Sequence, residues 1–246
     1  MRDWQAELDN RVAFLRDLLA SSGAKGFIFG NSGGKDSALV GILCRKATEN
    51  VLGVIMPCAS ARNYGDDRNH ALLVSQAFDI PVTQVDLTTV KENYLKALDG
   101  VVELSHSAQI NINPRLRMTT VYAMGQSLGY LVAGTGNRSE VMMGYFTKWG
   151  DGAYDVNPIG DLLATEVFEF LRFLGAPAEI IDKAPSAGLY EGQTDEKDMG
   201  VSYAAIDKYL STGEANEADK AIIDAAIGRS AHKRRPALVY SNNTNQ

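Results

Sequence analysis

The sequence has little cysteine and no long apolar segment. Only two cysteines, Cys44 and Cys58, occur among 246 residues, and neither has the spacing of a metal-ligand pair, so we expect both to be packing residues. No run of eighteen apolar residues is present, which excludes a membrane-spanning helix from the prediction. Residues 1–20 mix charged and apolar side chains at helical spacing and are unlike a signal peptide. These features predict a cytoplasmic protein.

Positive charge is also scarce. Lysine and arginine total 24 against 30 aspartates and glutamates, which gives a net charge of −6. A nucleic acid is therefore not expected as the main ligand, because neutralising its phosphates requires a clustered basic surface. The one dense positive run, residues 232–235, is either a solvated tail or a binding site for an anion.

Familiar catalytic and nucleotide-binding motifs are absent. A Walker A loop needs a glycine five residues before its Gly-Lys pair and a hydroxyl residue after it, but Gly34-Lys35 has Phe29 and Asp36 in those places. The glycines of residues 30–34 do not have the Rossmann spacing either. No Ser-His-Asp or Cys-His arrangement is evident. A protein nucleophile is therefore not expected.

The sequence does contain a strand, a glycine turn and a helix in succession. Residues 27–29 form a short apolar run, residues 33–34 supply the turn, and helical periodicity starts at Asp36. Such a helix N-terminus attracts anions, and Ser32 and Ser37 add hydroxyl donors. Because Asp36 would repel a phosphate unless a cation stood between them, we interpret it as a magnesium ligand. The alternative is an ordinary glycine turn capped by Ser32 or Asp36.

The remaining chain alternates between strand and helix patterns. This rhythm predicts an α/β fold with a doubly wound, mostly parallel sheet and helices on both faces, which places the ligand at the carboxyl ends of the strands. Met56, at the end of the second strand, is then a candidate backbone contact for adenine. The expected strands span 27–29, 51–56, 81–85 and 131–133, and the expected helices span 4–22, 36–47, 66–78, 88–100, 115–128, 162–174, 178–182, 199–210 and 216–228.

Several segments between these elements are candidates for function. A second glycine-rich turn, residues 134–140, leads into a helix, and its Glu140 together with Asp36 could hold a metal over a triphosphate. The alternative is that Glu140 only favours the first helical turn. Residues 144–161 are expected to form a functional loop and residues 183–198 a lid. We expect an irregular segment over 105–113, with the next helix starting at Pro114.

Eight motifs in order resemble those of NAD synthetases, within the N-type ATP pyrophosphatase superfamily, and the resemblance covers nearly the whole chain. It implies an adenine nucleotide alpha hydrolase-like fold, one domain over residues 1–246, and a homodimer with the dinucleotide lying across the subunit interface. The motifs are Ser32–Ser37, Pro114–Met118, Gly134–Glu140, Gly144–Gly152, Asp155–Ile159, Lys183–Ala187, Gly192–Glu196 and His232–Arg234.

The resemblance also implies roles for individual residues. Asp36 and Glu140 would be the catalytic residues, as the ligands of Mg²⁺. ATP would be bound by Gly30, Ser32, Gly33, Gly34, Lys35, Asp36, Ser37, Met56, Thr135 and Ser186. The second nucleotide, deamido-NAD, would be bound by Arg115, Lys148, Asp155, His232 and Lys233.

The implied reaction needs ATP, deamido-NAD and ammonia. The nicotinate carboxylate attacks the α-phosphorus of ATP, pyrophosphate leaves, and ammonia displaces AMP from the acyl-adenylate. Charge builds on the pyrophosphate, which a glycine loop, a helix N-terminus and a metal stabilise. Glutamine-dependent relatives carry an additional amidase domain with a cysteine nucleophile. This chain has no such domain, so we expect ammonia to be the donor unless a separate amidase subunit supplies it.

The sequence departs from the family pattern at a few positions. Pro114 replaces the usual alanine, and Ala164 stands where many members have an ATP-contacting lysine. Lys35, in the variable position of the loop, is a candidate substitute for that lysine. Two rival functions are an enzyme of the same superfamily that amidates or thiolates another nucleotide or tRNA, and a nucleotide-binding regulator that has lost catalysis.

Overall fold

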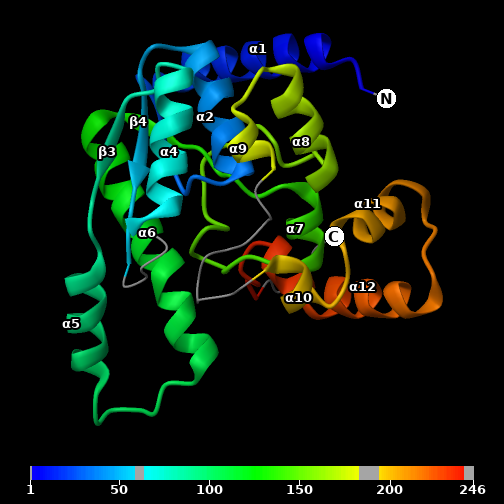
Figure 1. The fold of residues 1–246 in the computed structure, drawn as a ribbon. Coiled ribbons are helices and arrows are strands. Elements are labelled where there is room, and N and C mark those ends of the chain that lie inside the picture. The colour runs from blue at the N-terminus through cyan, green and yellow to red at the C-terminus, as the bar shows by residue number, and fades with distance from the viewer. Residues whose placement is uncertain (1, 59–63, 183–193, 241–246) are drawn as a thin grey trace.

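The computed structural model describes residues 2–58, 64–182 and 194–240. In these residues the strands form one four-stranded sheet in the order β3-β2-β1-β4, and all neighbouring strands are parallel. Figure 1 shows the arrangement. The strand bounds are β1 (Gly26–Gly30), β2 (Val51–Ile55), β3 (Val82–Gln84) and β4 (Tyr130–Val132).

Helices follow each strand, and the last helical segment ends at Arg234. They include a long helix, α6, and a group of helices at the end of the chain, which is shown in yellow to red in Figure 1. The helix bounds are α1 (Trp4–Ser22), α2 (Lys35–Ala47), α4 (Asp66–Ala77), α5 (Thr88–Leu98), α6 (His106–Leu128), α7 (Arg138–Met143), α8 (Ala164–Phe173), α9 (Ala178–Ile181), α10 (Asp195–Met199), α11 (Tyr203–Thr212), α12 (Glu217–Arg229) and the 3-10 helix η1 (Ala231–Arg234).

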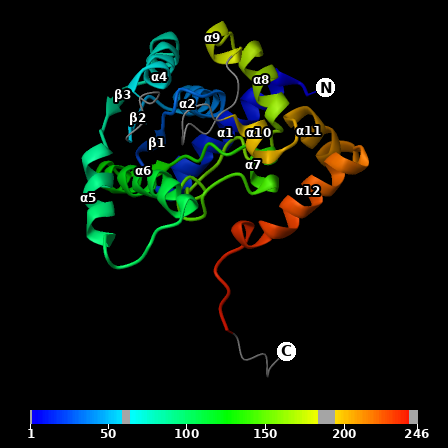
Figure 2. The same cartoon turned by 60° about the horizontal axis from the view of Figure 1, so that its bottom comes forward.

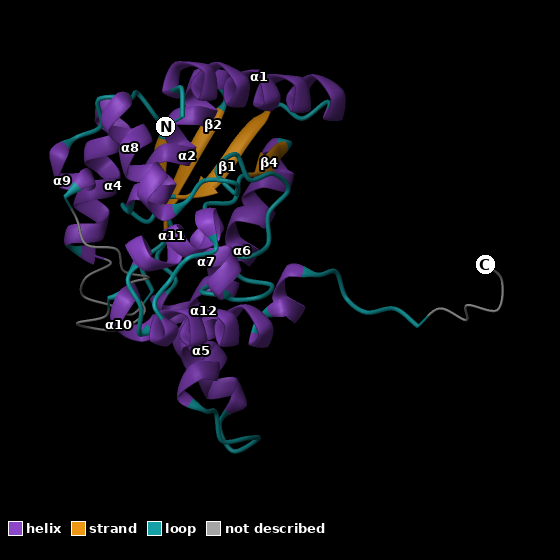
Figure 3. Ribbon diagram, turned by 90° about the vertical axis from the view of Figure 1, so that its right-hand side faces the viewer, coloured by secondary structure: helices purple, strands orange, loops and turns teal. Residues whose placement is uncertain are grey.

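The two faces of the sheet bury different helices. Successive side chains of β1 point to opposite faces, so Phe27 and Phe29 pack in one core with residues of α1, α2 and α8. Ile28 packs on the other face with Val121 of α6. Figure 3, with the strands in orange, shows the sheet enclosed by helices. The predicted fold class, a parallel sheet with helices on both faces, is confirmed.

A third, smaller core lies beside the sheet. It joins Met143 of α7, Ala164 of α8, Ile206 of α11 and Ile223 of α12. The chain then passes through η1 into an extended segment that leaves the helical layers, as Figure 2 shows, where Leu238 is 95 % exposed. Among the described residues, no helix is both long and apolar enough to cross a membrane.

One prediction about the elements was wrong. Helix α6 begins at His106, not at Pro114, because the Ser105 hydroxyl caps it by accepting a hydrogen bond from Ala108 N. Pro114 lies inside the helix and is buried, so packing outweighs the backbone donor that proline lacks. The lid stays a prediction: its residues 195–198 are helical in α10, and residues 183–193 lie outside the described residues. The other predicted elements are present, with bounds shifted by a few residues.

Candidate functional site

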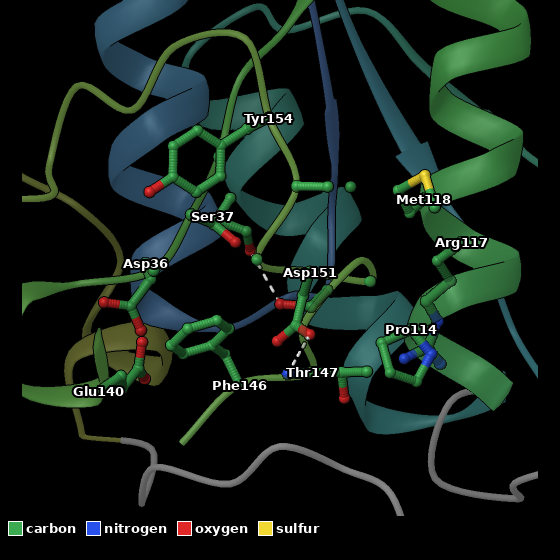
Figure 4. A pocket seen from close by; sticks show the side chains of 18 of the residues that line it. Asp36, Ser37, Pro114, Arg117, Met118, Glu140, Phe146, Thr147, Asp151 and Tyr154 are labelled. Atoms are coloured by element: carbon green, nitrogen blue, oxygen red, sulfur yellow. Dashed lines mark hydrogen bonds between the residues drawn. The ribbon is translucent and has the colours of Figure 1, made fainter. Parts of the chain in front are cut away.

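A pocket of about 800 Å³ opens at the carboxyl ends of β1 and β4. The strand order reverses here, since β2 and β3 extend the sheet from one side of β1 and β4 from the other. This switch point is where open α/β sheets bind ligands. Figure 4 shows residues from four parts of the chain, the first turn of α2, α6, α7 and the loop 144–154, converging on the pocket.

The first glycine loop is fixed against α4. Gly33 has a φ of +71°, and a Cβ placed there would lie 2.1 Å from the carbonyl oxygen of Asp67, so a larger residue does not fit. Asn31 is buried, accepts a hydrogen bond from Gly33 N, and donates from Nδ2 to Ser75 Oγ in α4 at 3.2 Å. The loop is therefore held in one conformation before any ligand binds.

The loop ends at the N-terminus of α2. Gly34 is the N-cap and provides no side-chain cap, while Ser32 Oγ accepts from Gly34 N at 3.3 Å and lies 3.1 Å from Ser37 Oγ. Backbone donors, hydroxyls and the positive end of the helix dipole thus face the pocket together. This arrangement suits a phosphate group. Gly30, Ser32, Gly34 and Ser37, which were predicted to bind ATP, line the pocket, and Gly33 shapes the turn between them.

Three carboxylates, Asp36, Glu140 and Asp195, line one side of the pocket, and we call them the acidic wall. Asp36 Oδ1 accepts from Asn137 Nδ2 at 3.0 Å, and Asp195 Oδ2 accepts from the hydroxyl of Tyr203 at 3.1 Å. In Figure 4 the Asp36 and Glu140 side chains point toward one another. The structure thus brings together the two carboxylates that the sequence predicted as metal ligands.

Glu140 caps the start of α7 and also lines the pocket, the position that its predicted metal-binding role requires. Its Oε2 accepts from Asn137 N at 3.1 Å in a capping box at the start of α7. Its Oε1 faces the pocket, 3.4 Å from the Tyr203 hydroxyl. Burial, followed by the nearby charge of Asp36, raises the pKa of Glu140 to about 8. Glu140 Oε1 therefore lies where negative charge is costly without a cation.

Lys35 supplies the positive charge inside the acidic wall. Its Nζ lies 2.5 Å from Asp36 Oδ2 and 4.0 Å from Glu140 Oε1, and its side chain is almost fully buried. Burial alone lowers the pKa of this lysine, but the charges of Asp36 and Glu140 outweigh burial and the net pKa is raised. Lys35 is therefore a stable cation at this place.

The acidic wall fits a magnesium ion that is bound jointly with a substrate. Among the described residues, no cluster of three or more His, Cys, Asp or Glu side chains is arranged to hold a metal. Mg²⁺ usually takes one or two carboxylates and completes its octahedron with phosphate oxygens and water. Asp36 and Glu140, beside a phosphate-binding loop, are such a pair of oxygen donors.

Basic side chains lie at the rim of the pocket. We call this group the basic rim, and its members are Arg115, Lys148, His232 and Lys233. Arg115 Nη2 donates to Lys148 O at 3.4 Å, and Lys148 Nζ donates to His232 O at 2.9 Å. Lys148 and Lys233 line the pocket, whereas the exposed Arg115 and His232 lie just outside its lining. Arg115, Lys148 and His232 are thus linked by hydrogen bonds, and Lys233 follows His232 in the chain.

Side chains of the C-terminal basic run are tied to the backbone. Lys233 Nζ donates to Gly144 O at 2.8 Å and to Phe146 O at 2.6 Å, and burial lowers the pKa of this lysine. Arg234 donates to carbonyls of α7 and α12, including Met142 O at 2.9 Å and Ile227 O at 2.6 Å. Lys233 and Arg234 are therefore not the side chains of a solvated tail.

Asp155, the fifth predicted substrate residue, lies apart from the rim and outside the pocket lining. Its Oδ2 accepts from Val132 N at 2.8 Å and its Oδ1 accepts from the Tyr122 hydroxyl at 3.2 Å. These bonds attach the loop to the end of β4 and to α6. In this structure Asp155 thus has an evident role in holding the fold.

Some residues of the site were not named from the sequence. Asp195, in the 192–196 motif, lines the pocket, and Asn137, in the second glycine turn, is buried outside the lining and donates to Asp36; both motifs could have indicated them. Partly buried Arg117 in α6 lines the pocket and donates to Met56 O at 3.1 Å, and burial lowers its pKa. Met56 and Thr135, which were predicted to bind ATP, line the pocket, while Ser186 lies outside the described residues.

Comparisons with known proteins identify the family of this chain. The sequence model of the family described as NAD synthase matches residues 7–243. An NH(3)-dependent NAD(+) synthetase of Carboxydothermus hydrogenoformans is 44 % identical over 236 residues, which cover 95 % of this chain and 96 % of the relative.

Solved structures show the same fold over the whole chain. NMN synthetase from Francisella tularensis has a TM-score of 0.93 and 34 % identity, covering 98 % of this chain and 99 % of that one. An NH3-dependent NAD synthetase from Campylobacter jejuni, solved with a nitrate ion, has a TM-score of 0.81 and 25 % identity, covering 98 % and 100 %. Since the family model and the relative span nearly all of the sequence, the chain belongs to the NAD synthase family.

Proposed function

We propose that the protein makes NAD from deamido-NAD, ATP and ammonia through an acyl-adenylate, with release of AMP and pyrophosphate. The observation that carries this proposal is that the glycine loop, the acidic wall and the basic rim all lie at one pocket. The NH(3)-dependent NAD(+) synthetases among its relatives support the choice of reaction. These substrates are cytoplasmic metabolites, so we place the enzyme in the cytoplasm.

In this mechanism the first glycine loop and the α2 N-terminus bind the phosphates of ATP, and Met56 and Thr135 contact the nucleotide. Ser186 is proposed as a further ATP contact on the basis of sequence alone. Asp36 and Glu140 would hold Mg²⁺, which supplies charge neutralisation at the phosphates when bound. Fixed donors around the leaving pyrophosphate stabilise the charge that develops on it. No protein nucleophile is needed.

The basic rim is the proposed site of the acceptor nucleotide. Lys148 and Lys233 face the pocket, while Arg115 and His232 are exposed beside it. Such exposure suits residues that serve a site shared by two copies of the chain, so we propose a homodimer with the acceptor at the interface. Asp155 would act on the acceptor indirectly, through the loop that it attaches to β4.

A second candidate function is the amidation of nicotinate mononucleotide to NMN. Its support is the high TM-score, 0.93, with the NMN synthetase from Francisella tularensis. The two functions share the ATP site and the amidation chemistry and differ in whether the acceptor carries an adenylyl group. Enzymes with these two functions need to differ only in the basic rim and its surroundings, where the acceptor would bind.

One assay separates these functions. Pyrophosphate release from MgATP is measured with deamido-NAD or nicotinate mononucleotide, each with ammonium, with glutamine, or without a nitrogen source. The proposal predicts a higher kcat/KM for deamido-NAD and ammonium-dependent NAD formation. A preference for the mononucleotide would establish the second candidate. Pyrophosphate release with neither acceptor above the background would contradict both.

A further inference from the structure

Lys35 is a buried cation beside the two predicted metal ligands. This lysine is the first residue of α2, and its side chain is only 5 % exposed. Its ammonium lies between Asp36 Oδ2 and Glu140 Oε1, 2.5 Å and 4.0 Å away. It also lies 5.5 Å from the ring centroids of both Phe168 and Tyr203. The lysine therefore lies among two carboxyl groups and two aromatic rings.

The ammonium takes the place where a metal ion would bind. Cations that need the same carboxylate oxygens compete, because the Asp36 oxygen that contacts Lys35 cannot turn fully to a metal without losing that contact. The second oxygen of Asp36 accepts from the side chain of Asn137, and the second oxygen of Glu140 from the backbone of Asn137. The oxygens that face Lys35 are therefore the ones that a metal would use, although Glu140 Oε1 also accepts from the Tyr203 hydroxyl at 3.4 Å.

We propose that Lys35 is a built-in counter-cation of the Asp36–Glu140 pair, which competes with Mg²⁺ until the phosphates of ATP draw its ammonium away. The inference rests on the proposed function for the identity of the nucleotide and the metal. It makes Lys35 a positioning residue that couples metal binding to ATP binding. Mg²⁺ then binds tightly only when ATP is present.

The surroundings of Lys35 permit this movement. Its backbone lies at the N-terminus of α2, directly after the glycine loop, so phosphates bound there are within reach of its flexible four-carbon side chain. The attraction between an ammonium and an aromatic face changes gradually with position, so the rings of Phe168 and Tyr203 do not fix one rotamer. Arrival of Mg²⁺ would compensate the charge that the departing ammonium leaves at Asp36 and Glu140.

Manganese binding without nucleotide tests the proposal. Mn²⁺ takes the same oxygen ligands, and the free ion is counted by its paramagnetic resonance signal. We expect Lys35→Met to bind Mn²⁺ at least tenfold more tightly than the wild type. The matched control, Lys25→Met, removes the same charge from an exposed lysine before β1 and should leave the affinity unchanged. An equal or weaker affinity in Lys35→Met would overturn the proposal.

The same measurement with ATP, and without an acceptor, tests the coupling. The wild type should gain Mn²⁺ affinity strongly when ATP is added, whereas the gain in Lys35→Met should be at least tenfold smaller. The KM for ATP should rise severalfold in Lys35→Met. A gain of the same size in both proteins would contradict the coupling.

Thermal unfolding tests the proposal even if Lys35→Met is too unstable for the binding measurements. Removing the cation leaves buried carboxylates without compensation, which is destabilising. The double variant Lys35→Met/Glu140→Gln should then be more stable than Lys35→Met, while Glu140→Gln alone should not stabilise the wild type. Additive effects of the two substitutions would count against the counter-cation.

This inference and the proposed reaction can fail separately. Tighter Mn²⁺ binding by Lys35→Met, lost again when Asp36→Ala is added, would support the counter-cation even if no NAD were formed. Ammonium-dependent NAD synthesis, with Mn²⁺ binding unaffected by Lys35→Met, would uphold the reaction and overturn the inference.

Discussion

The acidic wall and the basic rim face the same pocket but are built differently. The wall is enclosed, and its carboxylates accept from side chains, Asn137 for Asp36 and Tyr203 for Asp195. The rim is half-exposed, and its cations donate to backbone carbonyls, as Lys148 does to His232 O. The wall is therefore fixed before a ligand arrives, whereas the rim still has donors and exposed surface to rearrange around one.

The difference suggests a division of labour. A rigid set of charges is most useful where charge develops during the reaction, because it needs no reorganisation at that moment. A rim that also holds the fold together is better suited to binding a substrate. Loss of a side chain there should mainly lower the affinity for that substrate. Substitutions in the two regions should therefore change different quantities.

The largest effect is expected from Asp36→Ala in the acidic wall. It removes one carboxylate of the proposed metal site and the partner of Lys35. The expected loss in kcat/KM for NAD formation is about 10³-fold, or ~4 kcal/mol, similar to the loss of a group that stabilises the transition state. Coupled measurement of pyrophosphate and NAD checks this value.

The control for Asp36→Ala is Asp9→Ala, which removes an exposed carboxylate from α1. It should leave both products at the wild-type rate. A loss in Asp36→Ala of less than tenfold, with the protein folded, would mean that the wall is not where the reaction is stabilised.

Arg234→Met should act on stability instead. The guanidinium donates to four acceptors on α7 and α12 and their connections, among them Met142 O and Ser230 Oγ at 2.7 Å. Losing charged donors to half-buried acceptors should lower the free energy of unfolding by about 2–3 kcal/mol. Urea unfolding checks this, with exposed Arg235→Met as the control. An unchanged midpoint would show that Arg234 does not hold the C-terminal segment.

The pH dependence of stability probes the wall. Burial and Asp36 raise the pKa of Glu140 in the folded protein from 4.5 to about 8, so the folded state binds more protons than the unfolded state between these values. Without metal or nucleotide, the contribution of Glu140 is complete below pH 4.5 and is lost as the pH rises through about 8. The slope approaches at most ~1.4 kcal/mol per pH unit.

Glu140→Gln is the variant that tests this slope. It cannot titrate, so its stability measured by urea unfolding should vary less between pH 5 and pH 8 than that of the wild type. Equal slopes for the two proteins would mean that Glu140 is ionised over the whole range.

Residues 30–37 and 134–140 explain why the wall could be predicted from sequence. Both segments combine a strand end, a glycine turn and an acid, and carboxyl ends of parallel strands meet at one edge of the sheet. Asp36 and Glu140 had to approach one another once β1 and β4 were neighbours. The strands and most helices followed in the same way from local periodicity.

The rim could not be derived by the same reasoning. Arg115, Lys148 and His232 come from a helix, a loop and a 3-10 segment, and no local pattern indicates that these meet. Only the resemblance to a family placed them at one site. The same limit explains Pro114, whose position inside α6 depends on packing, and Asp155, whose hydrogen bonds to Val132 and Tyr122 are tertiary.

The smallest effect is expected from Lys148→Met in the rim. The substitution removes a cation that donates to His232 O and lies 5.2 Å from the ring centroid of Trp149, but it leaves the acidic wall intact. If the rim binds the acceptor, the KM for deamido-NAD should rise about tenfold, ~1.4 kcal/mol, with kcat nearly unchanged, because the lost contact is equal in the ground state and the transition state.

The KM for ATP is the internal control for Lys148→Met, since the glycine loop and the wall are untouched. Steady-state kinetics with each substrate varied in turn separates the two constants. A fall in kcat as large as the rise in KM would remove the distinction between the regions, because Lys148 would then act in the transition state as the wall does. A rise in the KM for ATP alone would assign the rim to the wrong nucleotide, and the acceptor would have to lie elsewhere in the pocket.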